Sequence, residues 1–471
     1  MASIACALAL TAACGYVLLR TPFEVSEVTG NLLGFRTSPS AWGVTVAAFS
    51  GPSGSGSGFL RNLSFATGKQ LFDLANGHYF LTYRLFHVAL IATLLLLLVR
   101  LVRVDSATTW GLAVLSSLAL LGIHPFHEAV RETETNIKLI VPACVFVCLA
   151  LSASSPARWK DVAAMLLAFY GFFANELGLL LWVVLAAGYL VGFRGVSRSA
   201  VLGATALLGL YFYLRFVQWD VGTPAMTERP SGFGFQMYEA RQLVTMFEAN
   251  PYPFYLYNVA ATFLSVLFTE PRAGAFGFTR DLLSGSVQMG LLFEVLTSTL
   301  TTGVMAWFVV RRVPHWWRLE FAHDDRIFLV AAAVLAGNAA ISFPYAKEVS
   351  MSTGGTAYAL AMFPALHAFV ANGPVRLAAP WRVLGVYALV ACISLGWTLR
   401  GVSFFVDLRR SASRAQNDWV SVYEWMDSQG MAPLTAEDRA IIDGVRGEAL
   451  SMSVPRDYRE SRWLAWMDPV H

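Results

Sequence analysis

Apolar runs of about 20 residues recur along most of the chain, with short polar connections between them. A helix needs about 20 such residues to span the hydrocarbon core of a bilayer. The predicted spans cover residues 3–20, 82–102, 107–123, 137–154, 160–175, 177–193, 199–218, 288–311, 327–345, 355–372 and 383–401. This pattern predicts an all-α polytopic membrane protein with about 11 transmembrane helices.

The stretch 160–193 is too long for one ordinary crossing and short for two. Two short helices that meet at "FFANELG" would put Glu176 at their turn, where its carboxylate can reach water. One long tilted helix is the alternative, but it would bury Glu176 in the middle of the bilayer at a cost of several kcal/mol. We therefore predict two helices.

Three further segments lie outside the predicted spans. Segment 254–269 is apolar, and we predict a re-entrant or interfacial helix because a full crossing would reverse the orientation of everything after it. Residues 21–81 contain the flexible stretch "GPSGSGSGF", followed by "LRNLSFATGKQLFDLANG", which is typical of an interfacial helix. In the C-terminal tail, "LTAEDRAIIDGV" predicts a helix capped by Thr435.

Basic residues indicate the orientation of the chain. Lys and Arg fall in alternate connections, at 100–103, 158–160, 194–198, 311–318 and 376–382. The positive-inside rule places these connections and the N-terminus in the cytoplasm. A transmembrane domain of residues 1–401 would then carry a first extracytoplasmic loop (21–81), an extracytoplasmic or re-entrant region (219–287) and a small soluble tail (402–471). We expect a bacterial inner-membrane protein whose site faces the periplasm.

Composition agrees with a membrane protein, since 56% of the residues are hydrophobic and 14% are charged. The net charge is only +3, and the basic residues lie in short loops, which argues against nucleic acid as a partner. The five cysteines all lie in apolar segments, where packing is their expected role and a disulfide framework is not.

Charged side chains gather where the predicted helices reach the extracytoplasmic face. The set comprises Glu24, Glu27, His124, His127, Glu128, Arg131, Glu176, Arg215, Lys347 and Glu348. A carboxylate can take a proton from an attacking hydroxyl, and fixed cations can neutralise a departing phosphate. Carboxylates beside cations at one face therefore suit a reaction between a hydroxyl and a lipid-linked phosphate ester.

Other interpretations of these residues stay open. Charged residues at helix ends also satisfy membrane topology, Pro125 can simply end a helix, and Arg215 can extend to the interface. His124, His127 and Glu128 have a spacing that permits a divalent metal. A transporter would place its ionisable groups near the bilayer midplane, whereas here they collect at one face.

Several motifs, taken in order, resemble those of the GT-C membrane glycosyltransferases, especially the transmembrane O-mannosyltransferases with tetratricopeptide repeats and their bacterial relatives. "HPFHEAV" is similar to the family's His-Pro-x-His-x-Glu-Ala-Val after the third span, with one residue fewer before Glu128. "FEVSEVTGN" places Glu24 and Asn31 at the family's spacing. The weaker matches are "RNLSFAT" from Arg61, "YRLFHVAL", "FFANELGLLL" and "LYFYLRF".

The resemblance implies an inverting transferase that moves a sugar from a polyprenyl-phosphate donor to a hydroxyl of a protein or glycan acceptor. It implies that Glu24, or Glu27, is the general base, although the family has Asp there. The resemblance, which covers about residues 1–270, and the charged set at the extracytoplasmic face together give the candidate substrate-binding residues Arg61, His124, His127, Glu128, Arg131, Glu176, Arg215 and Lys347. Because of the Glu-for-Asp change, the alternative is a catalytically inactive relative that serves as a structural subunit of a membrane assembly.

Overall fold

The structure is a computed structural model that describes residues 2–38, 40–50, 62–131, 137–221, 231–234, 236–269, 274–344, 348–372, 380–431 and 434–453. Within these residues the regular structure is helical apart from one hairpin, in which β1 (Ser231–Phe233) pairs antiparallel with β2 (Gln236–Tyr238). The chain is thus an all-α protein of the membrane type, as predicted.

The first half of the chain forms the N-terminal helices and the first loop. In order, its elements are α1 (Ala2–Leu18), α2 (Val25–Thr37), α3 (Ala41–Ser50), α4 (Asn62–Ala75), α5 (Tyr79–Leu101), α6 (Ala107–Gly122), α7 (His124–Arg131), α8 (Ile137–Ala153), α9 (Arg158–Ala174), η1 (Glu176–Leu179), α10 (Leu180–Leu190), α11 (Arg198–Tyr213) and η2 (Leu214–Gln218). The segment predicted as an interfacial helix is helical, as α4, and its place at an interface stays a prediction; "GPSGSGSGF" lies outside the described residues.

The second half of the chain contains the longest helices. Its helical elements are α12 (Ala240–Phe247), α13 (Tyr252–Leu264), η4 (Ser265–Thr269), α14 (Gly274–Leu283), α15 (Met289–Trp316), α16 (His323–Ile341), η5 (Glu348–Met351), α17 (Ser352–Asn372), α18 (Pro380–Val420), α19 (Val422–Ser428) and α20 (Ala436–Ser451). Segment 254–269 is helical, as expected, in α13 and η4.

Each of the eleven predicted spans coincides with a helix, but the helices differ in length. Among the described residues, five helices are long and apolar enough to cross a membrane: Tyr79–Leu101, Arg198–Gln218, Met289–Trp316, Ser352–Ala371 and Val383–Val420. Others, such as α1 and α6, are apolar but have 17 residues or fewer. Such a helix is about 25 Å long, less than the roughly 30 Å of a hydrocarbon core. The count of eleven spans stays a prediction.

The stretch 160–193 consists of two helices, α9 and α10, and the predicted turn at "FFANELG" is confirmed. Asn175 is extended between them, and its side chain accepts a hydrogen bond from the Leu177 N–H. The two helices come so close that a Cβ on Gly178 would lie 1.9 Å from the Gly171 carbonyl oxygen. A glycine at 178 therefore permits the sharp reversal that brings Glu176 to the end of the bundle.

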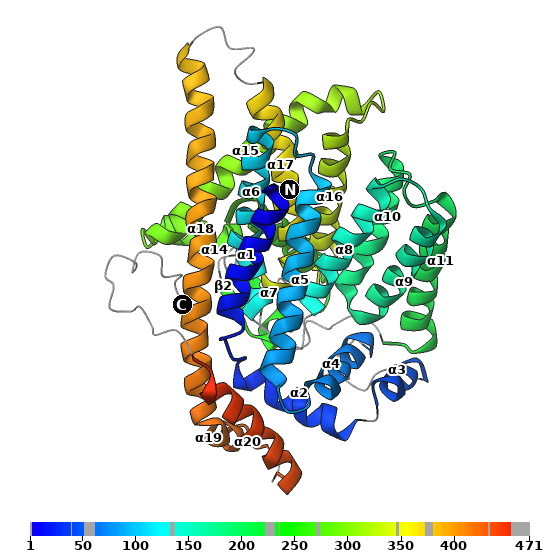
Figure 1. Cartoon of the computed structure of the whole chain (residues 1–471), viewed down its shortest axis with the longest axis vertical. Coiled ribbons are helices and arrows are strands. Elements are labelled where there is room, and N and C mark those ends of the chain that lie inside the picture. Colours follow the sequence, from blue (N-terminus) through cyan, green and yellow to red (C-terminus); the bar gives the residue numbers. More distant parts are fainter. Residues whose placement is uncertain are drawn as a thin grey trace.

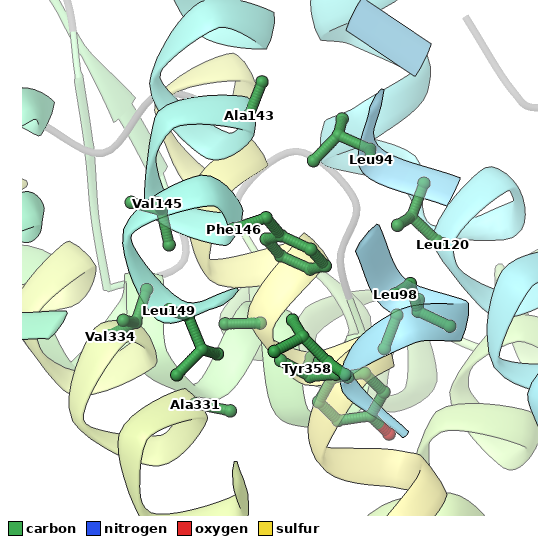
Figure 2. Close-up of a cluster of buried hydrophobic side chains, with 14 of the residues drawn as sticks. Leu94, Leu98, Leu120, Ala143, Val145, Phe146, Leu149, Ala331, Val334 and Tyr358 are labelled. Carbon is green, nitrogen blue, oxygen red and sulfur yellow. The ribbon is translucent and has the colours of Figure 1, made fainter. Parts of the chain in front are cut away.

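The main hydrophobic core lies between α5, α6, α8, α16 and α17. Figure 2 shows Leu98 of α5, Leu120 of α6 and Tyr358 of α17 around Phe146 of α8. Asn338 of α16 is a polar residue buried beside this core, and it accepts from the Gly354 N–H at 2.6 Å and donates to the Ser350 carbonyl at 2.8 Å. These bonds join α16 to the start of α17.

The connections predicted to be cytoplasmic are bonded to one another at one end of the bundle. His323 Nε2 donates to the Leu101 carbonyl at 3.0 Å, and Arg326 donates to the Gly192 carbonyl at 3.1 Å. Figure 1 shows α2, α3, α4, α19 and α20 together at the opposite end, away from the N-terminus. The first loop and the tail therefore share one end of the molecule, as the sequence predicted.

The C-terminal part differs from the prediction at one boundary. The last predicted span ends at 401, but α18 continues without interruption to Val420 (Figure 1, orange). Beyond 401, Phe404 and Leu408 still belong to the main core, whereas Trp419 and Ile442 join the first loop, through Phe23, in a second hydrophobic core. The predicted cap is confirmed, since the Thr435 hydroxyl accepts from the Asp438 N–H at the start of α20.

Candidate functional site

Glu24 stands at the N-terminus of α2, immediately after the short connection from α1. Its backbone is extended, with φ −67° and ψ 140°, and its side chain is exposed. The preceding residues, Thr21, Pro22 and Phe23, are buried. The carboxylate thus projects from a segment that is itself inside the protein.

A buried arginine, Arg84, forms hydrogen bonds to the segment that precedes Glu24. Arg84 of α5 is 1% exposed, and its guanidinium donates to the carbonyls of Thr21 at 2.8 Å, Pro22 at 3.2 Å and Val130 at 3.0 Å. It also lies 3.7 Å from the centroid of the Phe23 ring, a cation–π contact. Because Val130 is near the end of α7, Arg84 joins the backbone beside Glu24 to the helix that carries the two histidines.

Helix α7 contains the "HPFHEAV" motif. His127 Nε2 lies 2.5 Å from the Leu121 carbonyl oxygen, so this nitrogen carries the hydrogen and donates. The His127 ring is 4.7 Å from the ring of Phe404 in α18 and 6.3 Å from the ring of His124. His127 is therefore fixed against α6 and α18, and it holds the start of α7 in place.

A second buried arginine lies beside the junction of α6 and α7. Arg400 of α18 is 4% exposed and donates to the Gly122 carbonyl at 3.2 Å, to the Ser298 hydroxyl at 3.0 Å and to the Glu294 carbonyl at 3.4 Å. Its guanidinium is 4.2 Å from the Trp397 ring. A cation at the C-terminal end of α6 is favoured by the helix dipole.

Glu176 and Arg215 form an ion pair at the ends of α9 and α11. Arg215 Nη1 lies 3.1 Å from Glu176 Oε1 and donates to the Tyr211 hydroxyl at 2.6 Å. The Arg215 side chain is 4% exposed and that of Glu176 is 17% exposed. The structure brings this pair of predicted site residues into direct contact.

The remaining predicted site residues are placed only in part. Arg61 and Lys347 lie outside the described residues. Glu27 lies in α2, Glu128 and Arg131 lie in α7, and Glu348 begins η5, but the structure describes the backbone of these residues and not their side chains. Among the side chains that it does describe, no group of three His, Cys, Asp or Glu residues could hold a metal. That finding does not test the His124, His127 and Glu128 cluster.

A groove of about 400 Å³ runs between α9 and α11. Its walls are mostly apolar and include Met165, Leu166, Phe169 and Leu207, with Asp161 at one end. Further along, at the other end of the same two helices, stand Glu176 and Arg215. The two helices that line this apolar groove, α9 and α11, thus end at the charged pair of Glu176 and Arg215.

Sequence reasoning missed Arg84, Arg400 and Trp419 as parts of this region. Arg84 and Arg400 each lie inside a predicted span, and an ionisable residue within a span is by itself a sign of a functional or structural site. Trp419 gave no such sign, because it follows the last predicted span in a polar stretch.

Comparison with known proteins does not identify a family for this chain. No family model, curated protein or solved structure matches the chain.

Proposed function

We propose that the chain is a membrane glycosyltransferase that moves a sugar from a polyprenyl-phosphate donor to an acceptor hydroxyl. In the proposed step, Glu24 takes the hydroxyl proton as the acceptor oxygen attacks the anomeric carbon. A new carbon–oxygen bond forms while the bond from that carbon to the phosphate oxygen breaks. The lipid phosphate leaves with the electron pair, and the configuration at the anomeric carbon inverts.

The observation that carries this proposal is the placement of Glu24. A general base must reach its substrate, yet an error of about 1 Å in its position can cost about a hundredfold in rate. Glu24 is exposed, whereas the three residues before it are buried and bonded to Arg84 or Trp419 through their carbonyls. An exposed carboxylate on a fixed segment is the arrangement that proton abstraction requires.

Two further features support a lipid-linked phosphate as donor. Arg215 offers a guanidinium, which suits the geometry of a phosphate. The apolar groove between α9 and α11 suits a hydrocarbon chain, and its volume of about 400 Å³ is typical of ligand pockets, which span about 300–1,000 Å³. We propose that the active site faces the periplasm of a bacterial inner membrane.

One observation favours the alternative, a structural subunit of a membrane assembly. Arg215 already has its charge balanced by Glu176, and such a pair at the ends of two helices also stabilises a fold without any substrate. The two functions differ in whether the protein binds a lipid-linked sugar.

Lipid mass spectrometry on the purified protein distinguishes them. We expect the wild type to carry polyprenyl phosphate, and Arg215→Leu to carry about tenfold less because a charge-assisted bond is lost. Arg194→Leu is the matched control, since Arg194 is exposed and follows α10, near the other end of the bundle. Equal lipid content in Arg215→Leu and the wild type contradicts the role of Arg215. A wild type that carries no polyprenyl phosphate favours a structural subunit.

A further inference from the structure

The three residues before Glu24 are fixed by donors from distant parts of the chain. Arg84, more than 60 positions away, bonds the carbonyls of Thr21 and Pro22, and the Trp419 indole N–H, 396 positions away, donates to the Phe23 carbonyl at 2.8 Å. Carbonyls in a buried connection have no helical partner and need another donor. This connection obtains one for each of three successive residues.

Trp419 is itself immobilised. It has no exposed surface, and its ring meets the Phe80 ring edge-on with centroids 5.6 Å apart. Phe80 in turn lies 5.7 Å from the ring of Phe23. The carbonyl of Phe23 is therefore fixed by Trp419 and its ring by Phe80. This fixes the backbone directly before Glu24.

Helix α20 connects the end of α18 to the first turn of α5 and to α2. Glu448 accepts from the N–H groups of Phe80 at 3.1 Å and Leu81 at 2.9 Å, which lie in the first turn of α5. Gln416 of α18 donates to the Ala449 carbonyl at 3.0 Å, and Arg36 of α2 pairs with Glu437 at 2.6 Å. We call the end of α18 together with α19 and α20 the C-terminal strap, because these elements join α2 to α5.

We propose that Trp419 is a positioning residue for the reaction: through the Phe23 carbonyl it fixes the backbone from which the Glu24 carboxylate projects. This inference rests on the proposed function, in which Glu24 is the base. The C-terminal strap is then part of the active-site architecture, although it supplies no group that touches the substrate.

The test compares Trp419→Phe with Trp425→Phe in the full-length protein. Trp419→Phe keeps an aromatic ring but removes the donor, whereas Trp425 is a partly buried tryptophan of the same strap and serves as the control. Hydrogen–deuterium exchange of residues 21–30 reports the mobility of the segment. For Trp419→Phe we expect exchange that is about 3- to 10-fold faster, as loss of one buried hydrogen bond predicts.

Sugar transfer from synthetic polyprenyl-phosphate sugars provides the second readout. For Trp419→Phe we expect kcat to fall about 10- to 100-fold with an unchanged KM for the donor, because the base is displaced and the donor site is not. If Trp419→Phe does not fold, Glu448→Gln weakens the same arrangement more mildly. The control should match the wild type in both readouts.

Two results overturn the proposal: exchange of residues 21–30 that is the same in Trp419→Phe and the wild type, or faster exchange with an unchanged kcat. A wild type that transfers no sugar from any donor overturns the proposed function and, with it, the catalytic role of Glu24. In that case the exchange readout still shows whether Trp419 fixes the segment, so the two failures are distinguishable.

Discussion

Arg84 performs several structural tasks with one side chain. A buried guanidinium loses its hydration, and that cost is offset only if its N–H groups find acceptors. The Arg84 donors point to carbonyls on either side, at Thr21 and Pro22 after α1 and at Val130 in α7. The planar fork of arginine can reach these acceptors together, which the single ammonium group of lysine cannot do.

Arg84→Lys should therefore destabilise the protein although it keeps the charge. We expect the free energy of unfolding to fall by about 2–4 kcal/mol, because at least one buried carbonyl loses its donor and the smaller side chain leaves a void. Thermal unfolding in detergent measures this change. Arg194→Lys is the control, since exposed Arg194 donates to the nearby Tyr189 and Phe193 carbonyls. An equal loss of stability in both variants contradicts the role of the Arg84 guanidinium.

At the scale of single elements, α20 docks through its first turn. The Thr435 hydroxyl and backbone N–H both donate to the Asp438 carboxylate, and Arg36 of α2 lies 2.8 Å from it. The hydrogen bonds from the Thr435 hydroxyl and N–H, followed by the charge of Arg36, lower the pKa of Asp438 below its usual value. The ionised form of Asp438 is thus the one that the docked tail prefers.

This pKa direction gives a pH dependence with a definite sign. Because the pKa is lower in the folded protein than in the unfolded chain, the stabilisation by Asp438 is complete above the usual aspartate pKa of about 3.9. It is lost as the pH falls through the lowered value. Acid should therefore release α20 from its docked position. Hydrogen–deuterium exchange of α20 measured in acid detects this release directly. Tryptic cleavage after return to neutral pH would miss it if α20 docks again.

Asp438→Asn reproduces the neutral state at pH 7. We expect faster tryptic cleavage at Arg439 and Arg446 than in the wild type, because α20 loses its charged partner for Arg36. Glu437→Gln is the matched control, since the Glu437 side chain is 80% exposed and a surface ion pair contributes about 0–1 kcal/mol. Equal cleavage of Asp438→Asn and the wild type contradicts the docking role of Asp438.

Helices with a strong local signal were predictable from the sequence. Long apolar runs became helices, the reversal before Glu176 was foreseen from its charge, and the Thr435 cap followed from its position before Glu437 and Asp438. The end of α18 was not foreseen, because charged residues such as Asp407 and Arg409 end an apolar run without ending a helix. An apolar window detects contact with lipid or core, but here the helix continues through a stretch that mixes charged residues with apolar ones that join the second hydrophobic core.

At the scale of the whole molecule, the bundle has two chemically different ends. One collects the basic connections, and the other collects the first loop, Glu24 and the C-terminal strap (Figure 1). The pairing of Phe23 with Trp419 across 396 positions belongs to this scale. No local pattern in one sequence encodes such a pair, so the part of the candidate site that depends on it could not be predicted.

The two-ended arrangement predicts which positions share a side of the membrane. In a cysteine-free background, Ser26→Cys in α2 and Ser428→Cys in α19 should both react with a membrane-impermeant thiol reagent from outside. Ser155→Cys, in the connection between α8 and α9, should react only after permeabilisation. All three serines are exposed, so accessibility within the protein does not limit the reaction. Opposite labelling of Ser26→Cys and Ser428→Cys contradicts the arrangement.

If Glu24 is the general base of a sugar transfer, its removal must slow the transfer step itself, and a comparison of rates shows whether it does. Transfer from polyprenyl-phosphate sugars should be measured for the wild type, Glu24→Gln and the neighbouring control Glu27→Gln. For Glu24→Gln we expect kcat to fall by about 10²- to 10⁴-fold with donor binding retained, and for Glu27→Gln we expect transfer near the wild-type rate. Glu24→Gln that transfers sugar as fast as the wild type contradicts this role of Glu24.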